Sequence, residues 1–167
     1  MMGSMANGAH LRWMAFVDGE NFKIRGQELA KSEDITLIGG DYFRRDEFLW
    51  FPGKAGFQAL GNVSVSGLRH DERGRRSYYY TSVQGSDEDL AEAKRRLYRL
   101  GFDPQVFKRP KTRHSKGVDI ALTRDMLCHA FRGNYDLAYL VAGDGDYLPL
   151  VEELKRLGKI VHVAFFL

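Results

Sequence analysis

The feature that most constrains the fold is an apolar run that stops at two carboxylates. Residues 137–142 are continuously apolar, and Asp144 and Asp146 follow within four positions. An unbroken apolar run of this length is typical of a strand buried on both faces, as in a parallel sheet. Behind the acids, apolar residues recur at helical spacing, at Leu150, Val151, Leu154 and Leu157. The chain is therefore expected to change from strand to helix at these two acids.

The two acids are expected to differ in role. Asp146 is well placed to cap the helix, Pro149 fits its first turn, and Gly158 can terminate it after two basic residues. Asp144 precedes the cap and lies at the carboxyl end of the strand, where open α/β sheets bind their ligands. Capping therefore explains Asp146 alone, whereas Asp144 indicates a functional site.

An earlier segment repeats this arrangement. The apolar run 13–17 ends at Asp18, and a stretch compatible with a helix follows through Ala30. Gly19 permits a tight exit from the strand that keeps Asn21 close to the acid. Asn21 either caps this helix or helps to position a ligand, and the pattern leaves both roles open.

The rest of the chain alternates between strand and helix patterns. The further predicted elements are strands at 63–68, 77–83, 105–107 and 160–166 and helices at 90–100 and 117–132, the second with Ile120, Thr123, Leu127, Ala130 and Phe131 on its apolar face. The first two of these strands are expected to form a hairpin, joined by a charged turn at 69–76. Ser86 and Asp89 are expected to form a capping box at the start of the helix at 90–100. Residues 35–67 as a whole give a poor signal. Such alternation predicts an α/β fold in which helices sandwich a parallel sheet.

Composition fits one globular domain. The chain has 167 residues, of which 44% are hydrophobic and 28% charged. No apolar stretch approaches the roughly 20 residues of a membrane span, and no signal peptide is evident, so we expect a cytoplasmic protein. Residues 1–10 are expected to be a tail left from expression, and 11–167 the domain, with a helix after the last strand expected to be missing. The single cysteine, Cys128, is expected in the core.

Acids at strand ends and helix starts point to a metal. Asp18, Asp119, Asp144 and Asp146 all occupy such positions, which share the carboxyl edge of a parallel sheet. Like charges gathered there need a cation, and oxygen ligands select hard ions such as Mg²⁺ or Mn²⁺. The histidines lack paired spacing and no CxxC is present, so the usual zinc sites are excluded. Helix capping explains each acid singly but the set less well.

Basic side chains indicate a polyanionic partner. The net charge is only +3, but basic side chains are concentrated in two loops. One carries Lys108, Arg109, Lys111, Arg113 and Lys116, and the other carries Arg69, Arg73, Arg75 and Arg76. Tyrosines 78–80 either provide stacking surfaces for bases or lie in the strand core. A flexible strand can approach an acidic pocket more readily than a duplex, which favours single-stranded RNA as the partner.

Three motifs together resemble a known family. They are Phe-Val-Asp-Gly-Glu-Asn at 16–21, Lys-Gly-Val-Asp-Ile-Ala-Leu at 116–122 and Val-Ala-Gly-Asp-Gly-Asp-Tyr-Leu-Pro-Leu-Val-Glu at 141–152. In this order they resemble NYN domains, LabA-like members of the PIN-like nuclease superfamily. The resemblance implies a Rossmann-like three-layer α/β/α sandwich, an acidic Mg²⁺ or Mn²⁺ site and cleavage of RNA. It places the metal site on Asp18, Asp119, Asp144 and Asp146, with Asn21 as a polar support.

Two functional hypotheses follow. The first is a metal-dependent ribonuclease in which Lys116 contacts the scissile phosphate. The second is a catalytically silent RNA-binding or adaptor module, favoured by Ala142, which stands where the family often has Ser or Thr. A haloacid dehalogenase-type phosphatase is excluded because Phe16 occupies the position of its nucleophilic Asp. An EF-hand loop is excluded because Pro149 stands where Gly is required. The oligomeric state is left open.

Overall fold

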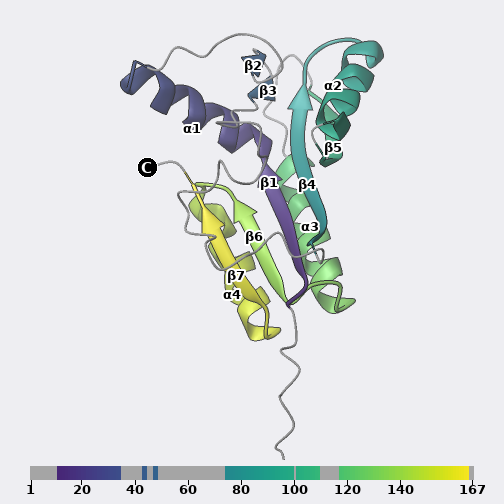
Figure 1. Ribbon diagram of the computed structural model, residues 1–167, viewed down its shortest axis with the longest axis vertical. Helices are drawn as coiled ribbons and strands as arrows, with labels where there is room; N and C mark the ends of the chain where they lie inside the picture. The colour runs from purple at the N-terminus through teal and green to yellow at the C-terminus, as the bar shows by residue number, and fades with distance from the viewer. Residues whose placement is uncertain are drawn as a thin grey trace, which may run out of the picture.

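A five-stranded parallel sheet forms the centre of the molecule (Figure 1). This computed structural model describes residues 11–34, 43–44, 47–48, 74–99, 101–109 and 117–165. Its strand order is β5-β4-β1-β6-β7, and each neighbouring pair is parallel. The strands are β1 (Trp13–Asp18), β4 (Gly74–Val83), β5 (Asp103–Lys108), β6 (Leu137–Val141) and β7 (Ile160–Ala164). A separate antiparallel pair consists of β2 (Phe43–Arg44) and β3 (Glu47–Phe48).

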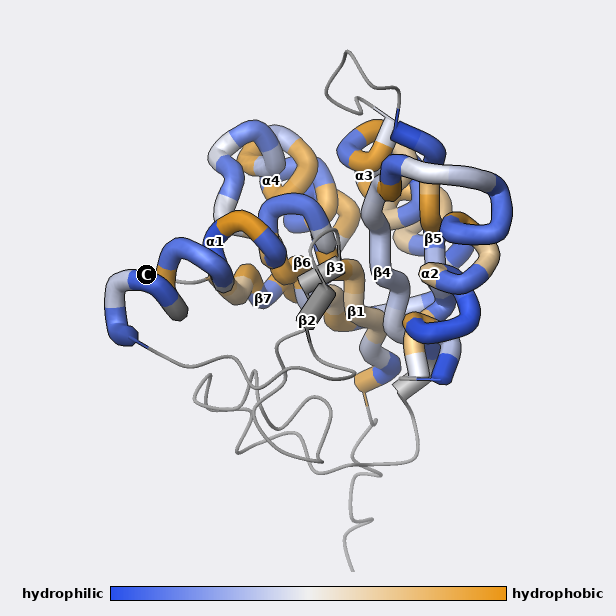
Figure 2. Tube along the Cα trace, turned by 90° about the horizontal axis from the view of Figure 1, so that it is seen from above, coloured by the Kyte–Doolittle hydropathy of each residue, from blue (hydrophilic) through white to orange (hydrophobic). Residues whose placement is uncertain are grey.

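Helices cover both faces of the sheet. They are α1 (Gly19–Ser32), α2 (Asp87–Arg99), α3 (Gly117–Phe131) and α4 (Leu148–Arg156), with a short 3₁₀ helix, η2 (Gly145–Tyr147), before α4. One core cluster joins the sheet to α3 and α4, and a second joins the opposite face to α1 and α2. Figure 2 shows α3 and α4 on one side of the sheet and α2 on the other. The predicted three-layer α/β/α sandwich is confirmed.

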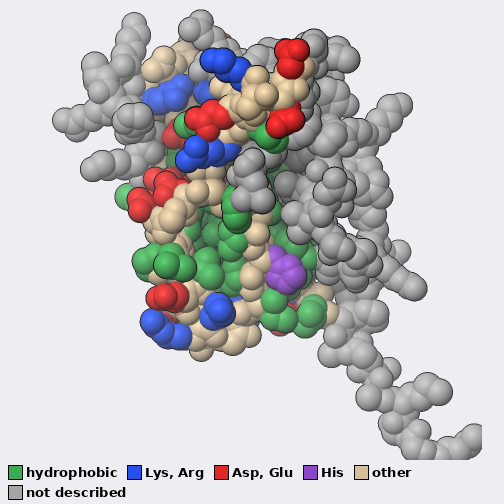
Figure 3. All heavy atoms as spheres, turned by 90° about the vertical axis from the view of Figure 1, so that its left-hand side faces the viewer, with side chains coloured by type: hydrophobic (Ala, Val, Ile, Leu, Met, Phe, Trp, Pro, Cys, Tyr) green, Lys and Arg blue, Asp and Glu red, His purple; other side chains and the backbone are tan. Residues whose placement is uncertain are grey.

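Burial follows from the position of each strand in the sheet. All five residues of β6 and the last five of β1 are buried, because these strands have neighbours on both sides and helices on both faces. At the edge, Ile160 and Val163 of β7 and the following Phe165 are exposed, and hydrophobic side chains gather on this side of the molecule (Figure 3). The continuous apolar run at 137–142 therefore identified a central strand correctly.

The tyrosines of β4 belong to the core. Tyr78 and Tyr80 lie in the cluster under α3, and Tyr79 lies in the cluster on the other face. All three are at most 6% exposed, so of the two alternatives that the sequence left open, a place in the strand core is the one that the structure shows. The strand also begins at Gly74, so residues 74–76 belong to β4 and not to a turn.

Two predictions about α3 are also wrong. Its buried face consists of Val118, Ala121, Leu122, Met126 and Ala130. Ile120 and Phe131 are instead 67% and 69% exposed, and Cys128 is exposed as well. The reason is that apolar residues occur all around this helix, so its periodicity alone does not identify the side that meets the sheet.

Predicted helix boundaries agree well with the structure. Ser86 and Asp89 cap α2 reciprocally, because the Asp89 amide donates to Ser86 Oγ over 3.2 Å and the Ser86 amide to Asp89 Oδ2 over 2.8 Å. Gly101 and Gly158 follow α2 and α4 with φ of 88° and 73°, a conformation that glycine adopts readily. The strand predicted at 63–68 and its hairpin lie outside the described residues.

Candidate functional site

Asp18 joins β1 directly to α1. It is only 4% exposed, and its Oδ1 accepts a hydrogen bond of 3.0 Å from the Asn21 amide, so Asp18 is the N-cap of the helix. A side chain at position 19 would meet the Tyr79 ring at 2.2 Å and the Tyr80 carbonyl at 2.7 Å, so only glycine fits. The immediate turn from strand to helix therefore depends on Gly19, and capping of α1 by Asn21 was a wrong alternative.

Asn21 instead ties two strand ends together. Its Oδ1 accepts a hydrogen bond of 2.8 Å from the amide of Gly143, the residue that precedes Asp144. The first turn of α1 thus holds the loop that leaves β6. A role of Asn21 in positioning a ligand stays a prediction.

Tyr147 brings two of the predicted acids together. Its hydroxyl lies 3.0 Å from Asp18 Oδ2 and 3.2 Å from Asp119 Oδ1, and its side chain is buried. Burial raises the pKa of this hydroxyl, so it stays protonated. A hydroxyl has one hydrogen and can donate to only one of the two carboxylates. Asp119 is an exposed residue, so its carboxylate can also accept from water, whereas Asp18 is buried. We call Asp18, Asp119 and Tyr147 the buried corner after the burial of Asp18 and Tyr147.

The charge state of the corner reflects its burial. Removal from water raises the pKa of Asp18 from 3.8 to about 6, against the lowering effects of the Asn21 amide and the Tyr147 hydroxyl. The nearby Asp119 carboxylate raises it further. Ionised Asp18 is therefore costly in the folded protein, and a positive ion beside it would relieve that cost.

The other two acids lie on an exposed loop. Asp144 Oδ1 accepts a hydrogen bond of 3.0 Å from the Asp146 amide and caps η2, whereas Asp146 is the second residue of that 3₁₀ turn. The prediction that Asp146 caps the helix is therefore wrong. The extra turn moves the cap two residues upstream, and α4 itself begins after Tyr147 with Pro149 in its first turn. We call Asp144 and Asp146 the exposed acids.

A divalent ion fits part of this arrangement. The corner supplies two carboxylates and a hydroxyl, a donor set of oxygens alone that suits Mg²⁺ or Mn²⁺. Among the described residues, however, no three His, Cys, Asp or Glu side chains lie together as a complete metal site. The structure thus joins Asp18 and Asp119, and leaves the exposed acids apart from them.

Sequence reasoning missed Tyr147 and the contacts of Glu20. The carboxylate of Glu20 accepts a hydrogen bond from Ser82 Oγ, which connects α1 to the end of β4. Tyr147 was given no role of its own, although it directly follows Asp146 at a junction already identified as functional. A hydroxyl among clustered carboxylates was the available signal.

Only part of the predicted basic loop is described. Lys108 ends β5 and forms an ion pair of 2.6 Å with Asp87 of α2. Arg109 is half-buried at the following position. Lys111, Arg113 and Lys116 lie outside the described residues, so their predicted contacts with nucleic acid stay predictions.

Comparison with protein families identifies the fold. The sequence matches the NYN domain over residues 12–166, nearly the whole chain. The chain belongs to the NYN domain family. The predicted resemblance is therefore confirmed at the level of the family, and the parallel sheet with its helices is the PIN-like, Rossmann-like fold that the family implies. In this NYN domain, the buried corner stands at the carboxyl ends of the central strands.

A solved structure supports the same fold. The crystal structure of a protein of unknown function from Vibrio parahaemolyticus is similar to this NYN domain, with a TM-score of 0.60 and 20% identity over 95% of this chain and 83% of that one. A comparison with curated proteins finds no match. Within the described ranges of the NYN domain, no helix is long and apolar enough to cross a membrane.

Proposed function

We propose that this NYN domain is a metal-dependent ribonuclease that hydrolyses phosphodiester bonds of single-stranded RNA with Mg²⁺ or Mn²⁺. The observation that carries the proposal is the buried corner, in which two carboxylates share one hydroxyl at the carboxyl edge of the sheet. Membership in a family with a nuclease fold supports the reaction class. Capping of α1 uses Asp18 Oδ1 alone, and the buried carboxylate beside Asp119 is costly when it is ionised.

Each residue has a role that follows from its contacts. Asp18 and Asp119 would hold the ion, and the exposed acids would complete its ligands from the loop. Asn21 keeps that loop against α1 through the Gly143 amide. When bound, such an ion makes a water nucleophilic and neutralises charge on the leaving oxygen. Tyr147 fixes the two carboxylates relative to each other, and so limits the geometries that an ion can adopt there.

Substrate would be held through its phosphates. The basic loop would attract the phosphates of RNA whatever its nucleotide sequence, through Lys108, Arg109, Lys111, Arg113 and Lys116. Lys108 already pairs with Asp87, so a phosphate must compete with that carboxylate for its ammonium group. We assign Lys116, three residues before Asp119, to the scissile phosphate.

The alternative function is RNA binding without cleavage. Ala142 favours it, because this buried position offers no hydroxyl beside the carboxyl end of β6. The incomplete set of acids in the structure favours it as well.

A cleavage assay separates the two functions. End-labelled single-stranded RNA is incubated with the purified protein in Mg²⁺, in Mn²⁺ and in EDTA, and binding is measured on the same samples by gel shift. The ribonuclease proposal predicts products only with a divalent ion. A gel shift without products in either metal would contradict it and support the binding module.

A further inference from the structure

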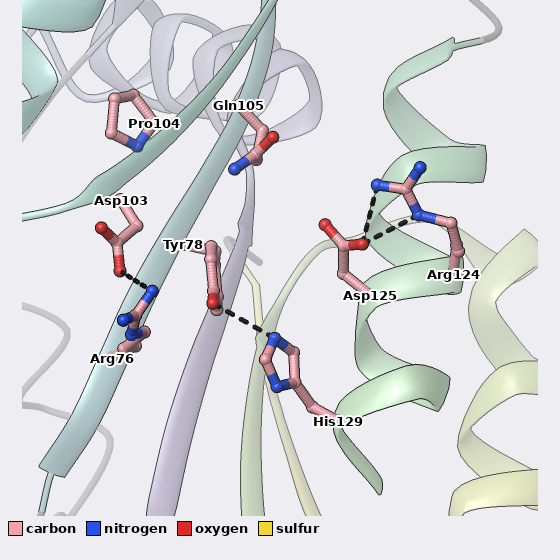
Figure 4. Close-up of a pocket in the computed structure, with 8 residues that line it drawn as sticks. All are labelled: Arg76, Tyr78, Asp103, Pro104, Gln105, Arg124, Asp125 and His129. Carbon is pink, nitrogen blue, oxygen red and sulfur yellow. Dashed lines mark hydrogen bonds and ion pairs between the residues drawn. The ribbon is translucent and has the colours of Figure 1, made fainter. Parts of the chain in front are cut away.

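A polar hollow lies beside the outer strand of the sheet, on the face covered by α3 (Figure 4). Its volume is about 350 Å³, near the lower end of the range for small-molecule sites. Its lining comes from β4, β5 and α3 and consists of Arg76, Tyr78, Asp103, Pro104, Gln105, Arg124, Asp125 and His129. We call it the β5 hollow, and none of its residues takes part in the buried corner.

A chain of hydrogen bonds orients the floor of the hollow. The Asn134 side-chain amide donates to His129 Nδ1 over 2.8 Å, so the neutral ring carries its proton on Nε2. Nε2 lies 3.1 Å from the Tyr78 hydroxyl and donates to it. The same hydroxyl interacts with the guanidinium of Arg76, and this contact raises the pKa of Arg76. Burial lowers the pKa of His129, which agrees with the neutral ring.

The walls present donors next to acceptors. Arg76 and Asp103 lie 3.5 Å apart in a loose ion pair, with 60% and 36% of their side chains exposed. Gln105, two residues further along β5, offers an amide donor and an amide acceptor in one group. Asp125 is fully engaged, because it accepts from Tyr80 and pairs with Arg124 at 2.8 Å. The groups of the hollow that a ligand can reach are therefore Gln105 and the exposed pair Arg76–Asp103.

We propose that the β5 hollow binds a guanine base of single-stranded RNA, an inference that rests on the proposed function. The Watson–Crick edge of guanine carries the O6 acceptor beside two N–H donors, N1 and N2. A guanidinium and a carboxylate side by side match this edge, with Arg76 donating to O6 and Asp103 accepting from both N–H groups. Unpaired bases in RNA expose this edge to protein side chains.

One wall of the hollow, at Asp125, lies on the same helix as Asp119 of the acidic site. Asp119 and Asp125 lie six residues apart on α3, which corresponds to about 9 Å along the helix. A short stretch of single strand spans that length. The hollow would therefore set a preference for guanine at a fixed distance from the scissile bond.

Nucleotide titrations without metal test the proposal directly. GMP, AMP, CMP and UMP are each added to the protein, and binding is followed by NMR shifts of backbone amides in β5 and α3. We expect GMP to bind most tightly and Asp103→Asn to weaken it about tenfold, the discrimination of one good bidentate contact. Glu28→Gln on α1 is the matched control, because it also removes the carboxylate of an exposed ion pair. Equal binding of the four nucleotides, or no GMP binding, would overturn the proposal.

RNA cleavage gives a second and separable test. Cleavage of a random single-stranded library is expected to show guanine enriched at one position near the cut, and Asp103→Asn is expected to lose that enrichment with little change in total cleavage. If the wild-type protein cleaves RNA with no guanine enrichment, the guanine-binding proposal is wrong and the ribonuclease proposal stands. GMP binding at the hollow without any cleavage refutes the nuclease and leaves the base site intact.

Discussion

The buried corner and the exposed acids contain the same chemical group in two different situations. In the corner, Asp18 and Asp119 are held by strand, helix and the Tyr147 hydroxyl, and Asp18 has almost no contact with water. The exposed acids are solvated, and the contact recorded for Asp144 is a helix cap. Folding thus holds the two carboxylates of the buried corner close together, whereas the exposed acids remain in contact with water. Only the corner stores an electrostatic cost that an ion can relieve.

The largest effect is expected on cleavage. Asp119→Asn keeps the shape of the corner but removes one of its two charges. Because loss of even an outer-shell partner costs about 10- to 100-fold at a metal site, loss of this carboxylate should reduce cleavage by about 100-fold or more. Initial rates on single-stranded RNA provide the measurement, with Glu28→Gln as control. Cleavage by Asp119→Asn at the wild-type rate would remove the corner from the mechanism.

The second effect is on stability without metal. Because burial raises the pKa of Asp18 from 3.8 to about 6, its contribution to stability is full below pH 3.8 and is lost as the pH rises through 6. A pKa that is raised by about two units on folding corresponds to about 3 kcal/mol of unfolding free energy. Asp18→Asn, which still caps α1, should therefore raise the unfolding free energy by up to about 3 kcal/mol at pH 8. Urea titrations at pH 8 and pH 4 measure it, and a variant equally destabilised at both would show Asp18 to be purely structural.

A smaller effect is expected from the hydroxyl that joins the corner. Tyr147→Phe keeps the ring in the core and removes one hydrogen bond to a charged group, so it should cost about 1.5–3 kcal/mol without metal at pH 8. In Asp18→Asn the same change should cost less, because the amide needs no donor from Tyr147. A double-mutant cycle in urea measures this coupling. If the two substitutions change the unfolding free energy additively, the Tyr147 hydroxyl does not stabilise the Asp18 carboxylate.

The smallest effect separates the exposed acids from each other. Asp144→Ala removes the cap of η2 and should cost ~1 kcal/mol, whereas Asp146→Ala should change stability by less than about 0.5 kcal/mol. Thermal unfolding of the two variants measures the difference. The reverse order would restore Asp146 as the cap that its position in the sequence indicated.

The origin of that wrong prediction shows what a pattern can reveal. Sequence pattern located β1 and β6, because these strands bury nearly all their residues, and α4, because its buried Leu150 and Leu154 lie on one face. It did not reveal η2, since one turn of 3₁₀ helix has no period of its own, and the cap was placed two residues late. It also failed for α3, where Ile120 and Cys128 point to solvent from a helix that is apolar all around.

The candidate site likewise has a part that the sequence predicted and a part that it did not. Chain position alone indicated that Asp18 and Asp119 meet at the carboxyl edge, because parallel topology brings strand ends and helix starts together. Their connection through Tyr147 depends on side-chain direction across three elements, which no local pattern encodes. The buried state of Tyr78–Tyr80 followed from the place of β4 between β1 and β5, and strand order was not predicted.

Binding of Mn²⁺ measured by calorimetry tests the central claim most directly. If the buried corner is the cation site, the wild-type protein binds Mn²⁺, Asp119→Asn binds it at least about tenfold more weakly, and Glu28→Gln binds it normally. The heat should vanish in EDTA, and the melting temperature of the wild-type protein should rise with Mn²⁺ because the ion binds only the folded state. Equal Mn²⁺ affinity in the wild-type protein and Asp119→Asn, or no binding by either, would contradict the account.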